Sequence, residues 1–134
     1  MRRIGKCLGA LGRPGRRDRG DRQALIVCGL GYASYRLLAR IAASRRYTAV
    51  AVIDDEPWNH GTEVEGVRVH YPSEAASLAR RHGVVAVVHD EPATLAMFDG
   101  ATRAALGEAG VPVVRLSGAA PESLETQLRA ARGH

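Results

Sequence analysis

The 134-residue chain has no long hydrophobic run and few cysteines. Its longest apolar stretches span roughly five residues, far below the 20 or so that a transmembrane helix needs. Segment Ile4–Leu11 is interrupted by glycines and a lysine, so it lacks the apolar region of about 7–15 residues that a secretory signal requires. Cys7 and Cys28 allow at most one disulfide. We therefore expect a protein of the reducing cytoplasm.

Lysine is also scarce, because it occurs only at Lys6. Short-chain dehydrogenases use a Tyr-x-x-x-Lys pair for proton transfer, and none of the four tyrosines can form one here. No other acid–base pair stands out from the spacing of the ionisable residues. The sequence therefore favours a protein without catalysis of its own.

The basic charge of the chain is confined to its N-terminal segment. Residues 1–22 hold eight basic and two acidic side chains, a net charge of +6, whereas residues 23–134 hold 11 basic and 12 acidic ones, a net charge of −1. We interpret residues 1–22 as a disordered basic arm and residues 23–134 as one folded domain. A nearly neutral domain predicts no specific nucleic-acid surface. Apolar residues at helical spacing in the arm leave a weak contact with an anionic membrane as an alternative to a plain solvated tail.

Short apolar runs alternate with helical stretches from Gln23 onward. The predicted strands are Ala24–Cys28, Thr48–Ile53, Val67–His70, Val84–Val88 and Val111–Leu116. The predicted helices are Tyr32–Ser44, a helix that begins at Ser73 and stops at Gly83, Thr94–Glu108 and Pro121–Arg132. This α/β pattern predicts a three-layer α/β/α sandwich on a Rossmann-like parallel sheet of about five strands in the order 3-2-1-4-5.

A glycine-rich turn follows the first predicted strand. Its residues are Gly29, Leu30, Gly31, Tyr32, Ala33 and Ser34. This G-x-G-x-x-S pattern differs by one residue from the dinucleotide-binding fingerprint G-x-G-x-x-G. Gly29 permits the tight turn, and Gly31 lets the backbone approach a pyrophosphate at the N-terminus of the next helix. Ser34 takes the third glycine position, where a small residue allows close helix–strand packing, so we expect residues 29–34 to contact a cofactor.

Acidic residues end the second predicted strand, about 20 residues beyond Ser34. In dinucleotide-binding domains an acid at this place accepts hydrogen bonds from the adenosine ribose, and Asp54 and Asp55 are the candidates here. The turn and the acid together predict a site for NAD or another adenine or uridine nucleotide. The alternative is that Asp54 only caps a loop beside an empty site.

His89 ends the fourth predicted strand and precedes two acids, Asp90 and Glu91. The expected strand order places His89 beside the first strand, so we expect it to border the same crevice. An acid–base pair and a metal site are two functional interpretations, but we favour a solvated loop because no second ligand pair has metal spacing. Trp58 either stacks on a base or fixes its loop to the domain. Cys28 is interpreted as a small core residue rather than a nucleophile.

Several segments of residues 23–92 resemble a known family. They are Leu25–Gly31, Tyr47–Pro57, Gly61, Val64–His70 and Ala79–Val84. They resemble the amino-terminal domain of bacterial polysaccharide-biosynthesis proteins, the membrane nucleotide-sugar epimerase/dehydratases and related sugar-phosphate transferases. The resemblance implies a Rossmann-like fold that binds a nucleotide, CoA or nucleotide-sugar, with the family's chemistry in a separate downstream domain. The chain departs from the family at His89, Asp90 and Glu91, where the family has small apolar residues. A more distant similarity, to NAD-binding regulatory domains of potassium transporters, rests on Val27–Gly31 and Val52–Asp54.

The sequence therefore favours a stand-alone nucleotide-binding module for an NAD-type dinucleotide or a nucleotide-sugar. The resemblance implies a sensor or a partner subunit for an envelope-polysaccharide enzyme, and self-association into a homo-oligomer stays open. One alternative is a small nucleotide-sugar or NAD-dependent oxidoreductase or epimerase that uses His89 and Asp90. Another is a regulatory or interaction domain with a decayed nucleotide site, whose arginine-rich arm contacts membrane lipid or another acidic partner.

Overall fold

A computed structural model describes residues 22–116 and 124–132 of the chain. The expectations for the basic arm, Lys6 and Cys7 lie outside these described residues. Within the described ranges, no helix is both long enough and apolar enough to cross a membrane.

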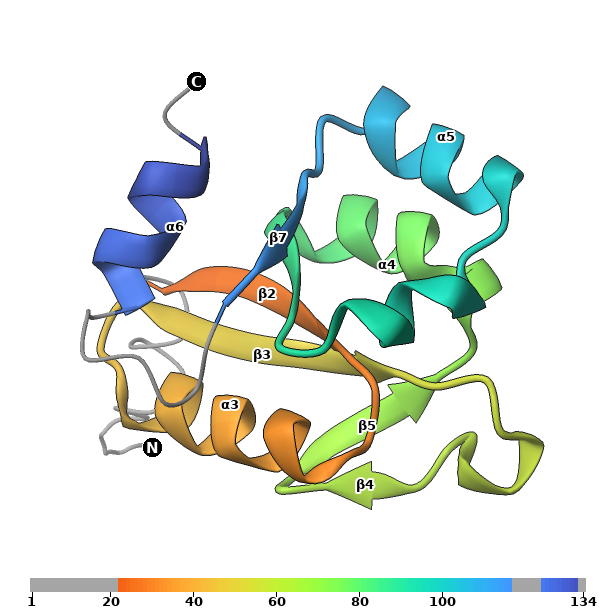
Figure 1. The fold of residues 1–134 in the computed structure, drawn as a ribbon, viewed down its shortest axis with the longest axis horizontal. Helices are drawn as coiled ribbons and strands as arrows, with labels where there is room; N and C mark the ends of the chain where they lie inside the picture. The colour runs from red at the N-terminus through yellow and green to blue at the C-terminus, as the bar shows by residue number, and fades with distance from the viewer. Residues whose placement is uncertain (1–21, 117–123, 133–134) are drawn as a thin grey trace, which may run out of the picture.

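The described part of the chain forms a six-stranded sheet with helices on both faces (Figure 1). The strands are β2 (Gln23–Cys28), β3 (Tyr47–Ile53), β4 (Glu63–Val64), β5 (Val67–His70), β6 (Val84–His89) and β7 (Val113–Arg115). Their order in the sheet is β4-β5-β3-β2-β6-β7, and every pair except β4 with β5 is parallel. The predicted order of the five parallel strands is therefore confirmed, with β4 added at one edge.

Four α-helices and three short 3-10 helices lie between or after the strands in the described ranges. The α-helices are α3 (Tyr32–Ala43), α4 (Ala75–His82), α5 (Gly100–Glu108) and α6 (Leu124–Arg132). The 3-10 helices are η1 (Pro57–Asn59), η2 (Pro72–Glu74) and η3 (Pro92–Met97). The predicted α/β class with helices between parallel strands is confirmed.

Two apolar layers hold the helices against the sheet because the central strands are apolar on both faces. Val27 of β2 belongs to a buried cluster with Leu37 of α3 and Leu128 of α6. Cys28, the next residue, belongs to the opposite cluster with Leu78 of α4 and Leu106 of α5. Since successive strand residues point to opposite faces, α3 and α6 cover one face and α4 and α5 the other. This is the expected three-layer sandwich.

The region between β3 and β5, where the sequence predicts no strand, contains the short strand β4. Glu63–Val64 pairs antiparallel with β5 through a two-residue turn at Glu65 and Gly66. Both turn residues have positive φ, 52° and 80°, as a type I′ hairpin turn requires. A strand of two residues is too short to show period-two alternation, which is why the sequence pattern did not reveal it.

The predicted helix Thr94–Glu108 is wrong in its first part. Pro92–Met97 forms the 3-10 helix η3, and α5 begins only at Gly100. The break has a clear local cause, because the Asp99 carboxylate accepts a 2.8 Å hydrogen bond from the Thr102 backbone N–H and caps α5. Elsewhere the helix ends agree more closely, and Gly83 ends α4 in the left-handed conformation as predicted. The predicted start of the last helix at Pro121 lies outside the described residues.

Candidate functional site

The turn between β2 and α3 requires glycine at position 29. Gly29 has a φ of +91°, and its N–H donates a 2.8 Å hydrogen bond to the Ile53 carbonyl at the end of β3. A Cβ atom here would lie 2.8 Å from Thr94 Cγ2 and 3.3 Å from Ser34 Oγ. The backbone conformation and the close neighbours therefore both disfavour a side chain at this position.

Ser34 ties the start of α3 to the end of β2. Its side chain is buried, and its Oγ donates a 3.1 Å hydrogen bond to the Cys28 carbonyl. A larger side chain would separate the helix from the strand at this point. Ser34 therefore stabilises the glycine turn from the buried side, where its hydroxyl contacts β2.

Gly31 is the N-cap of α3, in an extended conformation with φ −76° and ψ 177°. No side chain caps this helix, and its first turn contains no acidic residue. Glu91, the N-cap of η3, places its Oε1 3.1 Å from the position that a Gly31 Cβ would take. A helix N-terminus attracts negative charge, so the exposed Glu91 carboxylate occupies a place suited to an anion.

Asp54 is buried at the end of β3 and shapes the loop that follows. Its Oδ2 accepts hydrogen bonds from the Glu56 N–H at 3.2 Å and from Asn59 Nδ2 at 2.9 Å. The loop-capping role considered for Asp54 is therefore real. Within the described residues these bonds use one carboxylate oxygen only, which leaves Oδ1 for another donor.

A hollow of about 350 Å³ brings the glycine turn and the acids together. It is lined by Gly29, Leu30, Asp54, Asp55, Ala93, Thr94, Ala96 and Met97. Four of these residues come from η3, which was missed because the sequence pattern predicted an ordinary helix from Thr94. The hollow lies at the carboxyl ends of β2 and β3, the edge at which open α/β sheets bind ligands.

Other residues expected at the site lie beside the hollow rather than on its wall. Tyr32 is 76% exposed, and the Arg36 guanidinium lies 5.6 Å from the centre of its ring. Ala33 is half-buried in the first turn of α3. Together with Gly31 and Ser34, these residues surround the helix N-terminus without lining the hollow.

His89 is buried, so the interpretation of this residue as part of a solvated loop is wrong. Only 4% of His89 is exposed, and its Nδ1 has no hydrogen-bond partner among the described residues. Burial lowers the pKa of His89, with Arg115 adding to the effect and a Glu91 backbone hydrogen bond and Asp90 opposing it. His89 does not line the hollow, although it ends β6 next to β2 as expected.

Two further residues have clear environments. Trp58 on η1 is 72% exposed, so it does not fix its loop to the domain. Cys28 is fully buried in β2, and burial raises the pKa of its thiol to about 12. Cys28 is therefore a core residue, as predicted, because a thiol of such high pKa is a poor nucleophile at neutral pH.

A second hollow, of about 490 Å³, lies at the opposite edge of the sheet. Arg40, Arg46 and Glu125 contribute to its lining, where α3 ends and α6 begins. Although it is larger, it borders the amino ends of the strands, away from the glycine turn. The smaller hollow is therefore the better candidate for a ligand site.

No protein-family model matches the chain, and no curated protein matches it in sequence. Solved structures do match its fold. UDP-D-quinovosamine 4-dehydrogenase from Vibrio fischeri has a TM-score of 0.59 at 17% identity, and the match covers 82% of this chain and 86% of that one.

Structures of RSP, a Rex-family repressor, match as well. One has a TM-score of 0.59 at 14% identity, over 84% of this chain and 58% of the repressor. The complex of RSP with β-NADH has a TM-score of 0.57 at 15% identity, over 81% of this chain and 54% of the repressor. The chain thus spans little more than half of that protein. At such identities the likeness shows the fold alone, and this fold is a Rossmann-like α/β sandwich.

Proposed function

We propose that this chain is a nucleotide-binding module that holds an NAD-type dinucleotide or a nucleotide-sugar in the hollow at the carboxyl ends of β2 and β3. The observation that carries the proposal is that Gly29 and Asp54, from two different strand ends, line one hollow. The phosphates lie against the backbone of residues 29–31 and the N-terminus of α3. Asp54 Oδ1 accepts a hydrogen bond from a ribose hydroxyl.

The similar structures support a nucleotide ligand of this kind. RSP is described in complex with β-NADH, and the Vibrio fischeri protein is a dehydrogenase of a UDP-sugar. Among the described residues that line the hollow, the ionisable ones are Asp54 and Asp55, and the proposal places both at the ribose. Binding without catalysis is therefore the activity that we propose, as part of a sensor or as a partner subunit of an envelope-polysaccharide enzyme.

The two acids favour NAD over NADP. Asp54 and Asp55 both line the hollow, and negative charge there repels the 2′-phosphate that distinguishes NADP. Calorimetric titration of the full chain with NAD, NADP, CoA and a UDP-sugar tests the proposal. We expect saturable binding of NAD or the UDP-sugar, with NADP the weaker dinucleotide. A preference for NADP, or no binding of any of these ligands, would contradict the proposal.

Asp54→Ala should weaken a ribose-bearing ligand by about 1.5–3 kcal/mol, which corresponds to roughly 10- to 150-fold in Kd. The reason is the loss of a hydrogen bond to a charged oxygen. Because Asp54 also holds Asn59, the matched control is Asn59→Ala, which frees the loop but keeps the carboxylate. Calorimetry should give near-normal affinity for Asn59→Ala. Equal losses in the two variants would assign the effect to the loop instead of the ribose contact.

Glu91→Gln should strengthen nucleotide binding, because its carboxylate lies at the helix N-terminus where the phosphates are proposed to bind. Removing a negative charge a few ångströms from a phosphate strengthens binding by about 1 kcal/mol, or roughly fivefold in Kd. Glu108→Gln is the matched control, since Glu108 is exposed at the far end of α5. If calorimetry shows the same Kd for Glu91→Gln and the control, the phosphates do not lie at this helix.

A further inference from the structure

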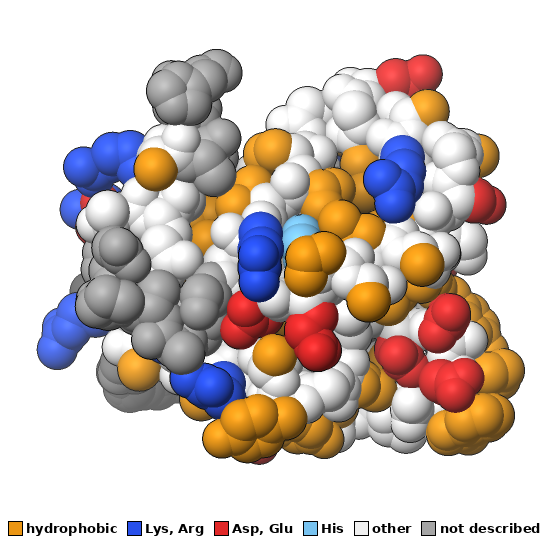
Figure 2. Space-filling view, in the orientation of Figure 1, with side chains coloured by type: hydrophobic (Ala, Val, Ile, Leu, Met, Phe, Trp, Pro, Cys, Tyr) orange, Lys and Arg blue, Asp and Glu red, His pale blue; other side chains and the backbone are white. Residues whose placement is uncertain are grey.

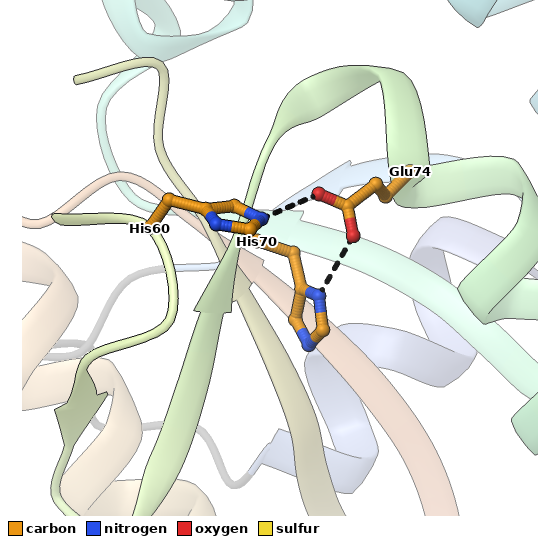
Figure 3. A group of neighbouring side chains, drawn as sticks. All are labelled: His60, His70 and Glu74. Carbon is orange, nitrogen blue, oxygen red and sulfur yellow. Dashed lines mark hydrogen bonds and ion pairs between the residues drawn. The ribbon is translucent and has the colours of Figure 1, made fainter. Parts of the chain in front are cut away.

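Two histidines and a glutamate meet on the surface near β5 (Figure 3). His60 follows η1, His70 is the last residue of β5, and Glu74 is the last residue of η2. One nitrogen of each histidine and a Glu74 oxygen all lie within 4.8 Å of one another. The hairpin of β4 and β5 brings His60 back beside His70, since the Gly61 N–H donates a hydrogen bond to the Val69 carbonyl. Three separate segments thus present their side chains to one point.

Hydrogen bonds already hold the three side chains in a converging arrangement. His60 Nε2 donates to Glu74 Oε2 at 2.9 Å, and His70 Nδ1 donates to Glu74 Oε1 at 3.1 Å. The Tyr71 backbone N–H also donates to Glu74 Oε2, at 2.9 Å. The His60 ring stacks on the Tyr71 ring at 4.1 Å between centroids, with 15° between the planes. The backbone N–H and the ring of Tyr71 therefore limit how far Glu74 and His60 can turn away.

We propose that His60, His70 and Glu74 bind a zinc ion. Zinc takes imidazole nitrogens and carboxylate oxygens at about 2.0–2.2 Å, so tetrahedral ligands lie roughly 3.3–3.6 Å apart. His60 Nε2 lies 2.9 Å from Glu74 Oε2 and His70 Nδ1 lies 3.1 Å from Glu74 Oε1, both close to this spacing. One ligand atom from each residue lies within 4.8 Å of the others, so side-chain rotations would bring both nitrogens and a carboxylate oxygen around one ion. Metal ligation replaces the shared protons between the imidazoles and the carboxylate, since both ligating nitrogens must be unprotonated.

The donor set selects the class of metal. Imidazole nitrogen suits zinc and other late first-row cations, whereas magnesium and calcium prefer oxygen ligands throughout. The site is also open, because 39% of the His60 side chain and 36% of the Glu74 side chain are exposed. Three protein ligands leave a fourth position that water can fill.

The ion would fasten the η1 loop to the end of β5. His60 follows Asn59, and Asn59 donates its side-chain hydrogen bond to Asp54 Oδ2. On the other side, the Asp54 backbone N–H donates to the His70 carbonyl at 3.0 Å. Zinc at this cluster would therefore steady the loop beside Asp54 without depending on any nucleotide.

Calorimetric titration of the full chain with zinc chloride tests the site. We expect saturable one-to-one binding, with magnesium and calcium chloride giving none. His60→Ala and Glu74→Gln should each weaken zinc binding by at least about tenfold. Loss of a residue that only hydrogen-bonds to a metal ligand already lowers metal affinity about tenfold or more, and loss of a ligand itself should lower it at least as much. Glu74→Gln keeps an oxygen for the Tyr71 N–H, so the local fold is retained.

His82→Ala is the matched control, since His82 is an exposed histidine at the end of α4 outside the cluster. It should bind zinc like the unchanged chain. In addition, zinc should raise the thermal midpoint of the unchanged chain and of His82→Ala, but not that of His60→Ala. No zinc binding, or equal affinity in all variants, would overturn the proposal.

Discussion

We expect Gly31→Val to abolish nucleotide binding while leaving the chain folded. Valine can adopt the extended backbone of Gly31, with φ −76° and ψ 177°, so the turn itself tolerates the change. Its Cβ, however, would lie 3.1 Å from Glu91 Oε1, in the space between the helix N-terminus and the opposite wall. The branched side chain then blocks the approach of a pyrophosphate to the backbone.

Calorimetric titration with NAD and circular dichroism together check this prediction. We expect no measurable heat of binding above dilution and a native-like spectrum. Gly107→Val is the matched control, because a Cβ there has open space around it and Gly107 lies in α5, away from the turn. That variant should bind NAD normally. Retained binding by Gly31→Val would show that phosphates do not contact this backbone.

Gly29→Ala should destabilise the fold by about 2–5 kcal/mol. The positive φ of +91° costs an L-residue roughly 1–2 kcal/mol, and a new methyl group 2.8 Å from Thr94 Cγ2 adds an overpacking cost of about 1–3 kcal/mol. Chemical denaturation measures the change in the free energy of unfolding.

Two variants separate the backbone cost from the steric cost at Gly29. Gly61→Ala has nearly the same φ, +84°, but its Cβ meets nothing within 4 Å, so it should lose only the backbone part. Thr94→Ser removes the methyl group that the new Cβ at position 29 would meet, while keeping a hydroxyl to donate to the Glu91 carbonyl. Combined with Gly29→Ala, it should recover part of the lost stability. Equal losses of unfolding free energy for Gly29→Ala and Gly61→Ala would show that Thr94 of η3 makes no steric contact with the turn.

Sequence patterns were sufficient for the parallel sheet because its signals are local. Each central strand is an apolar run that ends at a glycine or an acid, and chain-connection rules then restrict the order of the strands. The predictions of secondary structure were wrong where the sequence signal is short or weak. Glu63–Val64 is too short for a periodic pattern, and the alanine-rich segment 92–97 has helical composition although Asp99 starts a new helix after it.

The sequence predicted part of the nucleotide site but not the histidine cluster, again because only local signals can be read from a sequence. Gly29 and Asp54 stand at strand ends, so topology alone places them at one edge of the sheet. Thr94 reaches Gly29 only through the fold of η3. His60 and His70 are brought together by a hairpin whose short strand was not predicted, which is why spacing indicated no metal ligands. His70 and Glu74, four residues apart, were the one available sign.

The acidic side chains around the hollow agree with a ligand that is not strongly anionic. Figure 2 shows acidic side chains gathered near the centre and at the lower right of the viewed face, with basic side chains above them and toward the left. The three acids Asp54, Asp55 and Glu91 all lie on or beside the hollow. A ligand with one additional phosphate meets more repulsion there than NAD does.

A nuclear magnetic resonance titration of the ¹⁵N-labelled chain with NAD and, in parallel, with a UDP-sugar tests the proposed nucleotide site. It reports which backbone amides respond to the ligand. We predict that the largest shifts fall on Gly29, Leu30 and Gly31, on Asp55, and on Thr94 across the hollow, with β4 and α6 unaffected. Shifts centred on the opposite edge around Arg46 and Glu125, or none with either ligand, would contradict the proposed site.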